Sequence, residues 1–158
     1  MKTNLLFFIL ISGLINAGCS SLSNSKIYKS FSLQSIASKI AYKSIDCSKG
    51  ASGDGIDAEG FELGRGGTGN TRSSSIRCDV IEKGNKEFSE SDFIDALLSE
   101  VKKEIRGSGG MMTGSSRPSL SDFIVDYEVK GRQGKIKVSG KRSDSSYNLA
   151  SEISEWTK

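Results

Sequence analysis

This 158-residue chain contains three cysteines, Cys19, Cys47 and Cys78, whose thiols can take part in the widest range of reactions. A thiol can form a disulfide, bind a metal ion or carry a lipid. The sequence contains no histidine, so it lacks the side chain best suited to proton transfer near neutral pH and the commonest zinc ligand. Catalysis by Ser-His-Asp or Cys-His groups and HExxH metal chemistry are therefore excluded.

A glycine pattern at positions 64, 66 and 69 matches GxGxxG. In a dinucleotide site this pattern lets the backbone approach a pyrophosphate at a helix N-terminus. Here the following residues, 70–75, are polar and show no apolar helical stripe. A nucleotide site needs that strand-turn-helix setting, so we expect no cofactor.

Acidic residues in the same region could offer oxygen ligands to Ca²⁺. Asp54, Asp57 and Glu59 lie close together in the sequence but lack the twelve-residue spacing of an EF-hand loop. Exposed carboxylates without a ligand pattern are more often simply solvated. We therefore expect no metal site.

The N-terminal segment is typical of a secretory signal. Lys2 supplies the positive start, and an apolar run extends from Leu5 to Ile15. This run falls short of the roughly 20 apolar residues that a membrane-spanning helix needs. We expect residues 1–18 to be a signal peptide that is removed on export.

The end of this segment, Ala17-Gly18-Cys19, resembles the lipobox of bacterial lipoproteins. The resemblance implies that Cys19 receives an acyl chain such as palmitate on its thiol and becomes the mature N-terminus, in the cell envelope and outside the cytoplasm. Ser20 after the cysteine is compatible with the outer membrane of a Gram-negative cell. Asn16 stands where the family normally has an apolar residue. The alternative is ordinary cleavage, for example after Ala17, which leaves Cys19 unmodified.

Cysteine parity bears on this choice. An odd thiol is a liability in an oxidising compartment, whereas lipidation of Cys19 leaves Cys47 and Cys78 as a pair. A disulfide between these two would close a loop of mostly Gly, Ser and polar residues. The alternative is two free or metal-binding thiols, which the absence of CxxC spacing disfavours. We expect the disulfide.

The elements that position these residues should form a single α+β domain, since the mature chain has a typical one-domain length. We expect a flexible tether over 19–31 and the domain over 32–158. Glycine is dense over 48–75, which predicts a mobile loop with a short strand at 59–63. Alternation of apolar and polar residues over 76–80 predicts a strand.

Two amphipathic helices are expected to cover the sheet. Apolar spacing predicts one over 33–44. The other is predicted over 90–106, because Ser89 begins a capping box and Phe88 and Phe93 occupy the positions of a hydrophobic staple.

The pattern of the C-terminal part of the sequence predicts a three-stranded antiparallel meander, which follows a Gly/Ser-rich connection over 108–119. Apolar residues alternate over 123–129, a turn follows at 131–134, and alternation resumes over 136–138. The last strand, over 147–156, breaks the alternation and is expected to contain a bulge or a bend. The predicted fold is a small antiparallel sheet with a helix on its apolar face.

Lysines give this meander a basic hairpin. Lys135, Lys137 and Lys141 are expected to share its polar face, which could approach anionic lipid head groups or another envelope protein. Alternatively, lysines on an exposed sheet only prevent edge-to-edge pairing. The net charge of +3 falls to +2 without Lys2, which is too small to indicate nucleic acid.

The functional expectation is a membrane-anchored envelope lipoprotein whose domain is a non-catalytic binding or assembly module. The chain shows no paired acid and base motif from which an active site could be built. The alternative is a small envelope enzyme that uses carboxylate, Ser or Lys chemistry. An enzyme predicts a pocket lined by Asp, Glu and Lys, and a binding module predicts an exposed apolar patch.

Overall fold

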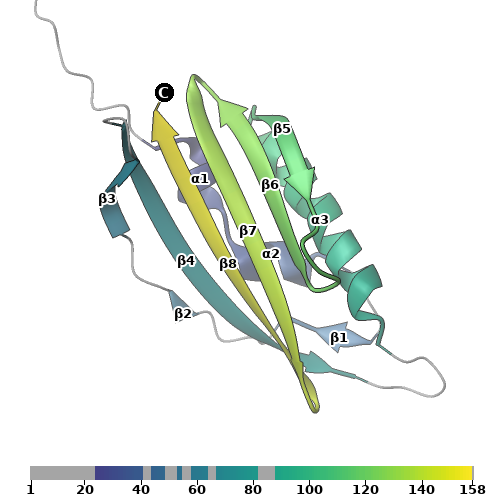
Figure 1. The fold of residues 1–158 in the computed structure, drawn as a ribbon. Helices are drawn as coiled ribbons and strands as arrows, with labels where there is room; N and C mark the ends of the chain where they lie inside the picture. The colour runs from purple at the N-terminus through teal and green to yellow at the C-terminus, as the bar shows by residue number, and fades with distance from the viewer. Residues whose placement is uncertain are drawn as a thin grey trace, which may run out of the picture.

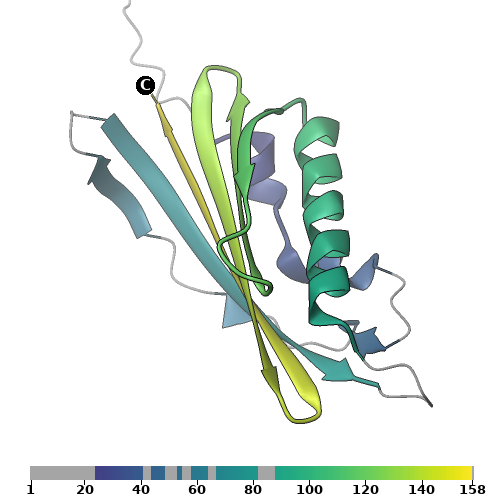
Figure 2. The same cartoon turned by 45° about the vertical axis from the view of Figure 1, so that its right-hand side comes forward.

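The computed structural model describes residues 24–40, 44–48, 53–54, 58–63, 67–81 and 88–157. These residues form a small α+β domain with a curled antiparallel sheet and helices on one side of it (Figures 1 and 2). The expected signal peptide and Cys19 lie outside the described residues. Among the described residues, no helix is both long enough and apolar enough to cross a membrane.

The described helices are α1 (Lys26–Ser30), α2 (Leu33–Ser38) and α3 (Glu90–Gly107). The described strands are β1 (Ile45–Asp46), β2 (Gly53–Asp54), β3 (Ala58–Leu63), β4 (Gly67–Val80), β5 (Met111–Ser116), β6 (Asp122–Val129), β7 (Arg132–Ser143) and β8 (Ser146–Thr157). The main path through the sheet is β1-β4-β8-β7-β6-β5, and β2 and β3 also pair with β4. The last strand in the chain therefore lies in the middle of the sheet (Figure 1).

The core fills the space between the sheet and the helices. Alternate residues of β6, from Phe123 to Val129, are buried, while the residues between them are partly exposed. Helix α3 contributes one apolar side to the same core: Phe93, Ile94, Leu97, Val101 and Ile105. The apolar side chains that recur at every second position in the strand and at about every fourth position in the helix thus pack together on one face of the sheet.

Helix α3 confirms the prediction for 90–106, because its start signals are local. The side chain of Ser89 accepts a hydrogen bond from the backbone N–H of Asp92. The rings of Phe88 and Phe93 lie 5.9 Å apart, so the predicted staple is formed. Both rings also pack on Tyr147 of β8, which fixes the helix to the sheet.

The glycine-rich region is largely strand. β3 confirms the short strand expected at 59–63, whereas the mobile loop expected up to residue 75 is wrong, because β4 begins at Gly67. β4 pairs with β8 continuously from Gly69 to Asp79. Its first part, residues 67–75, consists mostly of Gly, Ser and Thr, so backbone hydrogen bonds hold it in the sheet and no apolar alternation marks it in the sequence. Its second part confirms the strand predicted over 76–80.

The N-terminal end of the domain also differs from expectation. Residues 24–31 are not a flexible tether, because α1 buries Ile27 and Tyr28 and is followed by the buried Phe31. Arg72 of β4 lies over the Tyr28 ring, 5.5 Å from its centre, and donates to the carbonyl of Phe31. The folded domain therefore begins no later than Ser25.

Helix α2 is shorter than the helix predicted over 33–44. It ends at Ser38, and the N–H groups of Lys39 and Ile40 bond three residues back to the carbonyls of Ile36 and Ala37. Such tight bonds are typical of a last helical turn. Residues 41–43 lie outside the described part of the chain.

Three expectations for the C-terminal part need correction. The Gly/Ser-rich connection contains β5, an edge strand whose side chains are mostly exposed, so no apolar pattern marks it. The turn consists of Lys130 and Gly131, with φ values of 49° and 75°, and not of residues 131–134. Positive φ at both central residues is typical of a tight two-residue hairpin turn. β8 has no bulge, and its register is continuous with both neighbours.

A disulfide joins Cys47, the residue after β1, to Cys78 of β4. β1 pairs Ile45 with Val80 and Asp46 with Asp79, so the two cysteines continue this register by one position. Directly opposed residues in an antiparallel pair lie close enough to be bridged. The bond fits the pairing expected from the sequence and ties a two-residue strand to the sheet.

We predict that replacing both cysteines, as Cys47→Ser/Cys78→Ser, lowers the free energy of unfolding by about 3–4 kcal/mol. The reason is that the bond closes a loop with a sequence separation of 31, which restricts the unfolded chain. Urea denaturation of the oxidised chain and of the double variant measures the difference. An equal midpoint for the two would show that the bond does not restrain the unfolded state.

Candidate functional site

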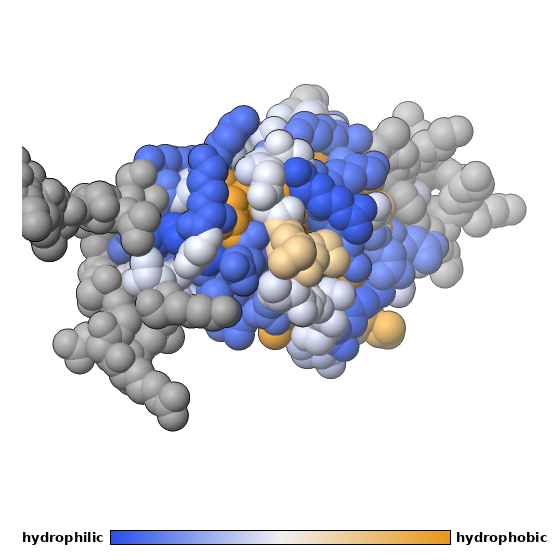
Figure 3. Space-filling model, turned by 90° about the horizontal axis from the view of Figure 1, so that it is seen from above, coloured by the Kyte–Doolittle hydropathy of each residue, from blue (hydrophilic) through white to orange (hydrophobic). Residues whose placement is uncertain are grey.

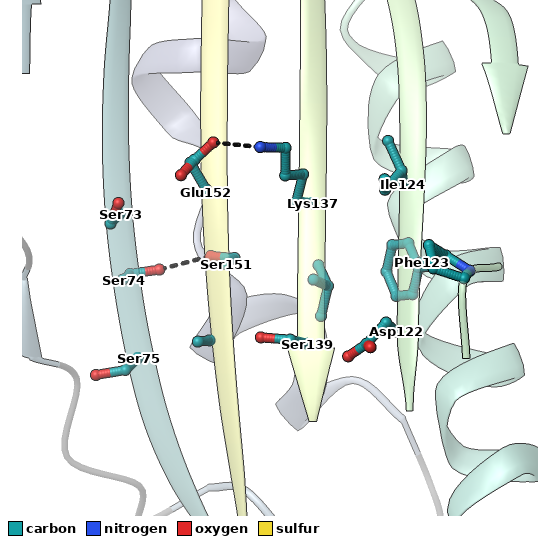
Figure 4. Close-up of a pocket in the computed structure, with 13 residues that line it drawn as sticks. Ser73, Ser74, Ser75, Asp122, Phe123, Ile124, Lys137, Ser139, Ser151 and Glu152 are labelled. Atoms are coloured by element: carbon teal, nitrogen blue, oxygen red, sulfur yellow. Dashed lines mark hydrogen bonds and ion pairs between the residues drawn. The ribbon is translucent and has the colours of Figure 1, made fainter. Parts of the chain in front are cut away.

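A hollow lies on the sheet face opposite the helices. It has a volume of about 520 Å³, within the range of small ligand pockets. Residues of β4, β8, β7 and β6 form it (Figure 4). Pro118 of the β5–β6 connection borders it. It is the candidate site of this domain, and we call it the sheet groove.

Two rows of side chains across the strands build the sheet groove. The first row, on β4, β8, β7 and β6 in turn, consists of Ser75, Ala150, Ser139 and Asp122. The second row, in the same order, consists of Ser73, Glu152, Lys137 and Ile124. The first row consists mostly of very small side chains, and the second row beside it has larger ones. The small side chains therefore form the floor of the hollow.

The charges of the second row are paired within the sheet groove. Lys137 Nζ lies 3.1 Å from Glu152 Oε1, and the two side chains are about half exposed (Figure 4). In the next row Lys135 pairs with Asp126 at 3.7 Å. Exposed pairs of this kind contribute little to stability, but they cancel each other's charge.

The three lysines expected on one polar face do lie together there. Lys135, Lys137 and Lys141 alternate with the buried Ile136 and Val138 along β7. Two of the three are neutralised by acidic neighbours on adjacent strands. This face is therefore much less basic than the sequence of β7 indicates.

The connection that borders the sheet groove is fixed to helix α3. Arg117 forms an ion pair with Asp95 of α3 and also donates to the backbone carbonyl of Leu120. Ser119 Oγ donates to Asp122 Oδ2 at 2.8 Å and accepts from the N–H of Ser121 at 3.1 Å. These local bonds hold Pro118 at the edge of the hollow.

A second polar cluster, which the sequence analysis missed, is buried at the other end of β8. Glu155 is fully buried, and one of its carboxylate oxygens lies 3.3 Å from Nε of the buried Arg132. Tyr127 donates to the carboxylate at 2.8 Å, and both the N–H (2.9 Å) and the hydroxyl of Ser25 donate to it as well. We call these four residues the Glu155 cluster.

Tyrosine packing supports this cluster. Burial, followed by the nearby Glu155 charge, raises the pKa of Tyr127 far above its usual range, so its hydroxyl stays a donor. Gly134 lies beneath this ring, and a Cβ there would overlap it. Gly140 likewise leaves room for the ring of Tyr147, whose hydroxyl donates to the Glu90 carboxylate at 2.7 Å. Burial raises the pKa of Tyr147 as well.

The break in alternation along β8 was the signal that could have revealed Glu155. Tyr147, Leu149, Ser151, Ile153 and Glu155 all face the helices. The break in alternation was expected to mark a bulge or a bend, although polar residues at inward positions explain it. A buried carboxylate needs a cation and hydrogen-bond donors, and none of these is near it in the sequence.

The other candidate residues have no described role. Cys19, Asp57, Gly64 and Gly66 lie outside the described residues, and Gly69 is part of β4. Asp54 and Glu59 belong to strands β2 and β3. Within the described ranges, no group of three His, Cys, Asp or Glu residues is placed to hold a metal ion.

We predict that Glu155→Ala lowers the free energy of unfolding by about 3–5 kcal/mol, because it leaves the Arg132 cation buried without its partner. The matched control is Glu152→Ala, three positions earlier on the same strand, where an exposed ion pair is lost at a cost of about 0–1 kcal/mol. Urea denaturation of both variants makes the comparison. Equal losses would contradict the role assigned to the Glu155 cluster, and Glu155→Gln provides a milder variant if the alanine variant does not fold.

Comparison with protein-family models, with curated proteins and with solved structures finds no match for this chain. No relative therefore supplies a residue role or an activity.

Proposed function

We propose that this protein is a bacterial envelope lipoprotein, anchored to a membrane through lipid on Cys19, whose domain is a non-catalytic module that binds another envelope protein. In a Gram-negative cell the anchor would lie in the outer membrane. The domain would consist of helices packed on one face of the sheet, with a meander of β6, β7 and β8 that presents the sheet groove on the other face.

The sheet groove is the observation that carries the binding role. Its floor of Ser75, Ala150 and Ser139 is open to solvent and can receive side chains of a partner. Serine hydroxyls can donate to or accept from a partner's backbone. Because Lys137 and Glu152 neutralise each other, the groove favours a partner surface without strong net charge.

The disulfide supports a location outside the cytoplasm. Bonds of this kind persist in oxidising compartments and are rare where glutathione keeps thiols reduced. Pairing of Cys47 with Cys78 also leaves Cys19 as the remaining thiol of the chain. A cysteine that follows a signal sequence and has no partner is suited to lipid attachment.

An enzyme remains the second candidate, because the sheet groove brings Asp122, Lys137 and Glu152 to one surface. These are the residue types that carboxylate and lysine chemistry needs. However, Lys137 and Glu152 are bonded to each other, and Asp122 accepts from Ser119, whose hydroxyl also closes a turn. The groups are engaged in holding structure, so we favour binding.

We predict that the N-terminal tryptic peptide from protein purified out of its native membrane runs from Cys19 to Lys26 and carries acyl mass on Cys19. Mass spectrometry detects this directly. An unmodified Cys19 would contradict the anchor and would mean that Asn16 prevents lipobox processing. That result would leave the binding role of the sheet groove to be judged separately.

We further predict that a photoreactive amino acid at Ala150 forms one discrete protein adduct in intact cells, because Ala150 lies in the floor of the sheet groove. The same probe at Ser99, exposed on α3, should give no such adduct. Ser139→Phe, which fills the groove, should abolish the adduct, whereas Asn148→Phe, on the same face outside the groove, should preserve it. Equal adducts from both probes, or an adduct insensitive to Ser139→Phe, would contradict the proposal.

A further inference from the structure

A second hollow lies at the end of the domain where the described chain begins. Its volume is about 520 Å³, and its lining includes Asn24, Ser25, Lys26, Lys29, Lys130 and Arg132. The lysines come from α1 and from the turn between β6 and β7. We call this hollow the basic pocket.

The charge of the basic pocket is strongly positive. None of the described residues that line it carries a carboxylate, and the buried Arg132 is already paired with Glu155. Lys26, Lys29 and Lys130 are exposed, and none of them forms an ion pair with any residue that the structure describes. This sets them apart from Lys135 and Lys137, whose charges are cancelled on the sheet.

The Glu155 cluster holds the basic pocket in shape. Arg132 donates to Asn24 Oδ1 at 3.4 Å, and Asn70 of β4 donates to the same oxygen at 2.6 Å. Ser25 is bonded to Glu155 through its N–H. The chain therefore enters the domain at a fixed point beside the lysines.

The distance from this entry point to the proposed anchor is short. Asn24 lies five positions after Cys19, and a fully extended chain of five residues spans at most about 18 Å. If Cys19 is acylated, this short tether lets the lysines of the basic pocket reach the lipid head groups. Lysines that near an anionic membrane surface are attracted to it, and the attraction falls off within a Debye length of about 8 Å.

The surface at this end suits contact with head groups. Figure 3 looks onto the end of the domain where β6 turns into β7, and most of its described surface is hydrophilic. Contact there would be electrostatic.

We propose that the basic pocket binds the phosphate head group of an anionic phospholipid in the membrane that holds Cys19. Lys26, Lys29 and Lys130 surround the phosphate, and the pocket orients the domain with this end toward the membrane. This inference rests on the proposed lipid anchor. The sequence predicted that the β7 lysines contact an anionic surface. The proposal assigns that contact to the lysines beside the point where the chain enters the domain.

The test uses the full mature chain with Cys19→Ser, so that no acyl chain contributes to binding. Co-sedimentation with phosphatidylcholine vesicles that contain phosphatidylglycerol is compared with co-sedimentation with pure phosphatidylcholine vesicles. Lys29→Gln/Lys130→Gln should weaken binding to the anionic vesicles by about 25-fold, since each lysine near such a surface contributes about fivefold. The control Arg77→Gln/Lys141→Gln removes the same charge from exposed positions on the sheet and should change binding by about twofold at most.

Three results would overturn the proposal: equal weakening by the two double variants, equal binding to both kinds of vesicle, or complete displacement by inorganic phosphate at the concentration of lipid phosphate. The last result would identify a site for free phosphate. Because the assay does not use the acyl group, its failure is distinguishable from failure of the lipid anchor, which the N-terminal peptide reports separately.

Discussion

The buried carboxylate of Glu155 is the constraint on which the rest of this fold depends. A charge without water is tolerated only when a cation and several donors surround it, and here they come from α1, β6 and β7. Ser25 and Glu155 are 130 residues apart in the sequence. One carboxyl group thus joins the beginning of the domain to its end, and Gly134 is required so that the Tyr127 ring can reach it.

Charge is distributed unevenly between the uncovered sheet face and the end where the chain enters. On the sheet, Lys137 meets Glu152 and Lys135 meets Asp126, so like charges do not accumulate. At the entry end, the lysines of α1 and of the β6–β7 turn have no acidic neighbour among the described residues of the pocket lining. The two surfaces are therefore suited to different contacts, one with a neutral polar partner and the other with an anion.

Parts of this fold were predictable where the determinants are local. Helix α3 carries its cap at Ser89 and its staple at Phe88 and Phe93 within a few residues, and the sequence analysis located it correctly. The end of β4 was predicted from the alternation over 76–80. Its first part, residues 67–75, could not be located, because its Gly, Ser and Thr residues carry no apolar pattern and are held by hydrogen bonds to β8, about 80 positions away. The sheet groove depends on the register of four strands, and the Glu155 cluster on side chains far apart in the sequence. The alternation of β8 contained evidence of the cluster, but a bulge and a buried acid break the pattern in the same way.

The central position of β8 sets the order in which the chain can become native. Until β8 is available, β4 and β7 have no strand between them, and the Ser25 hydroxyl has no acceptor in Glu155. The sheet therefore cannot close from its N-terminal side while β8 is still missing. If the chain is exported as proposed, it can pass unfolded through a narrow channel until β8 follows, and it acquires its full set of contacts only after that.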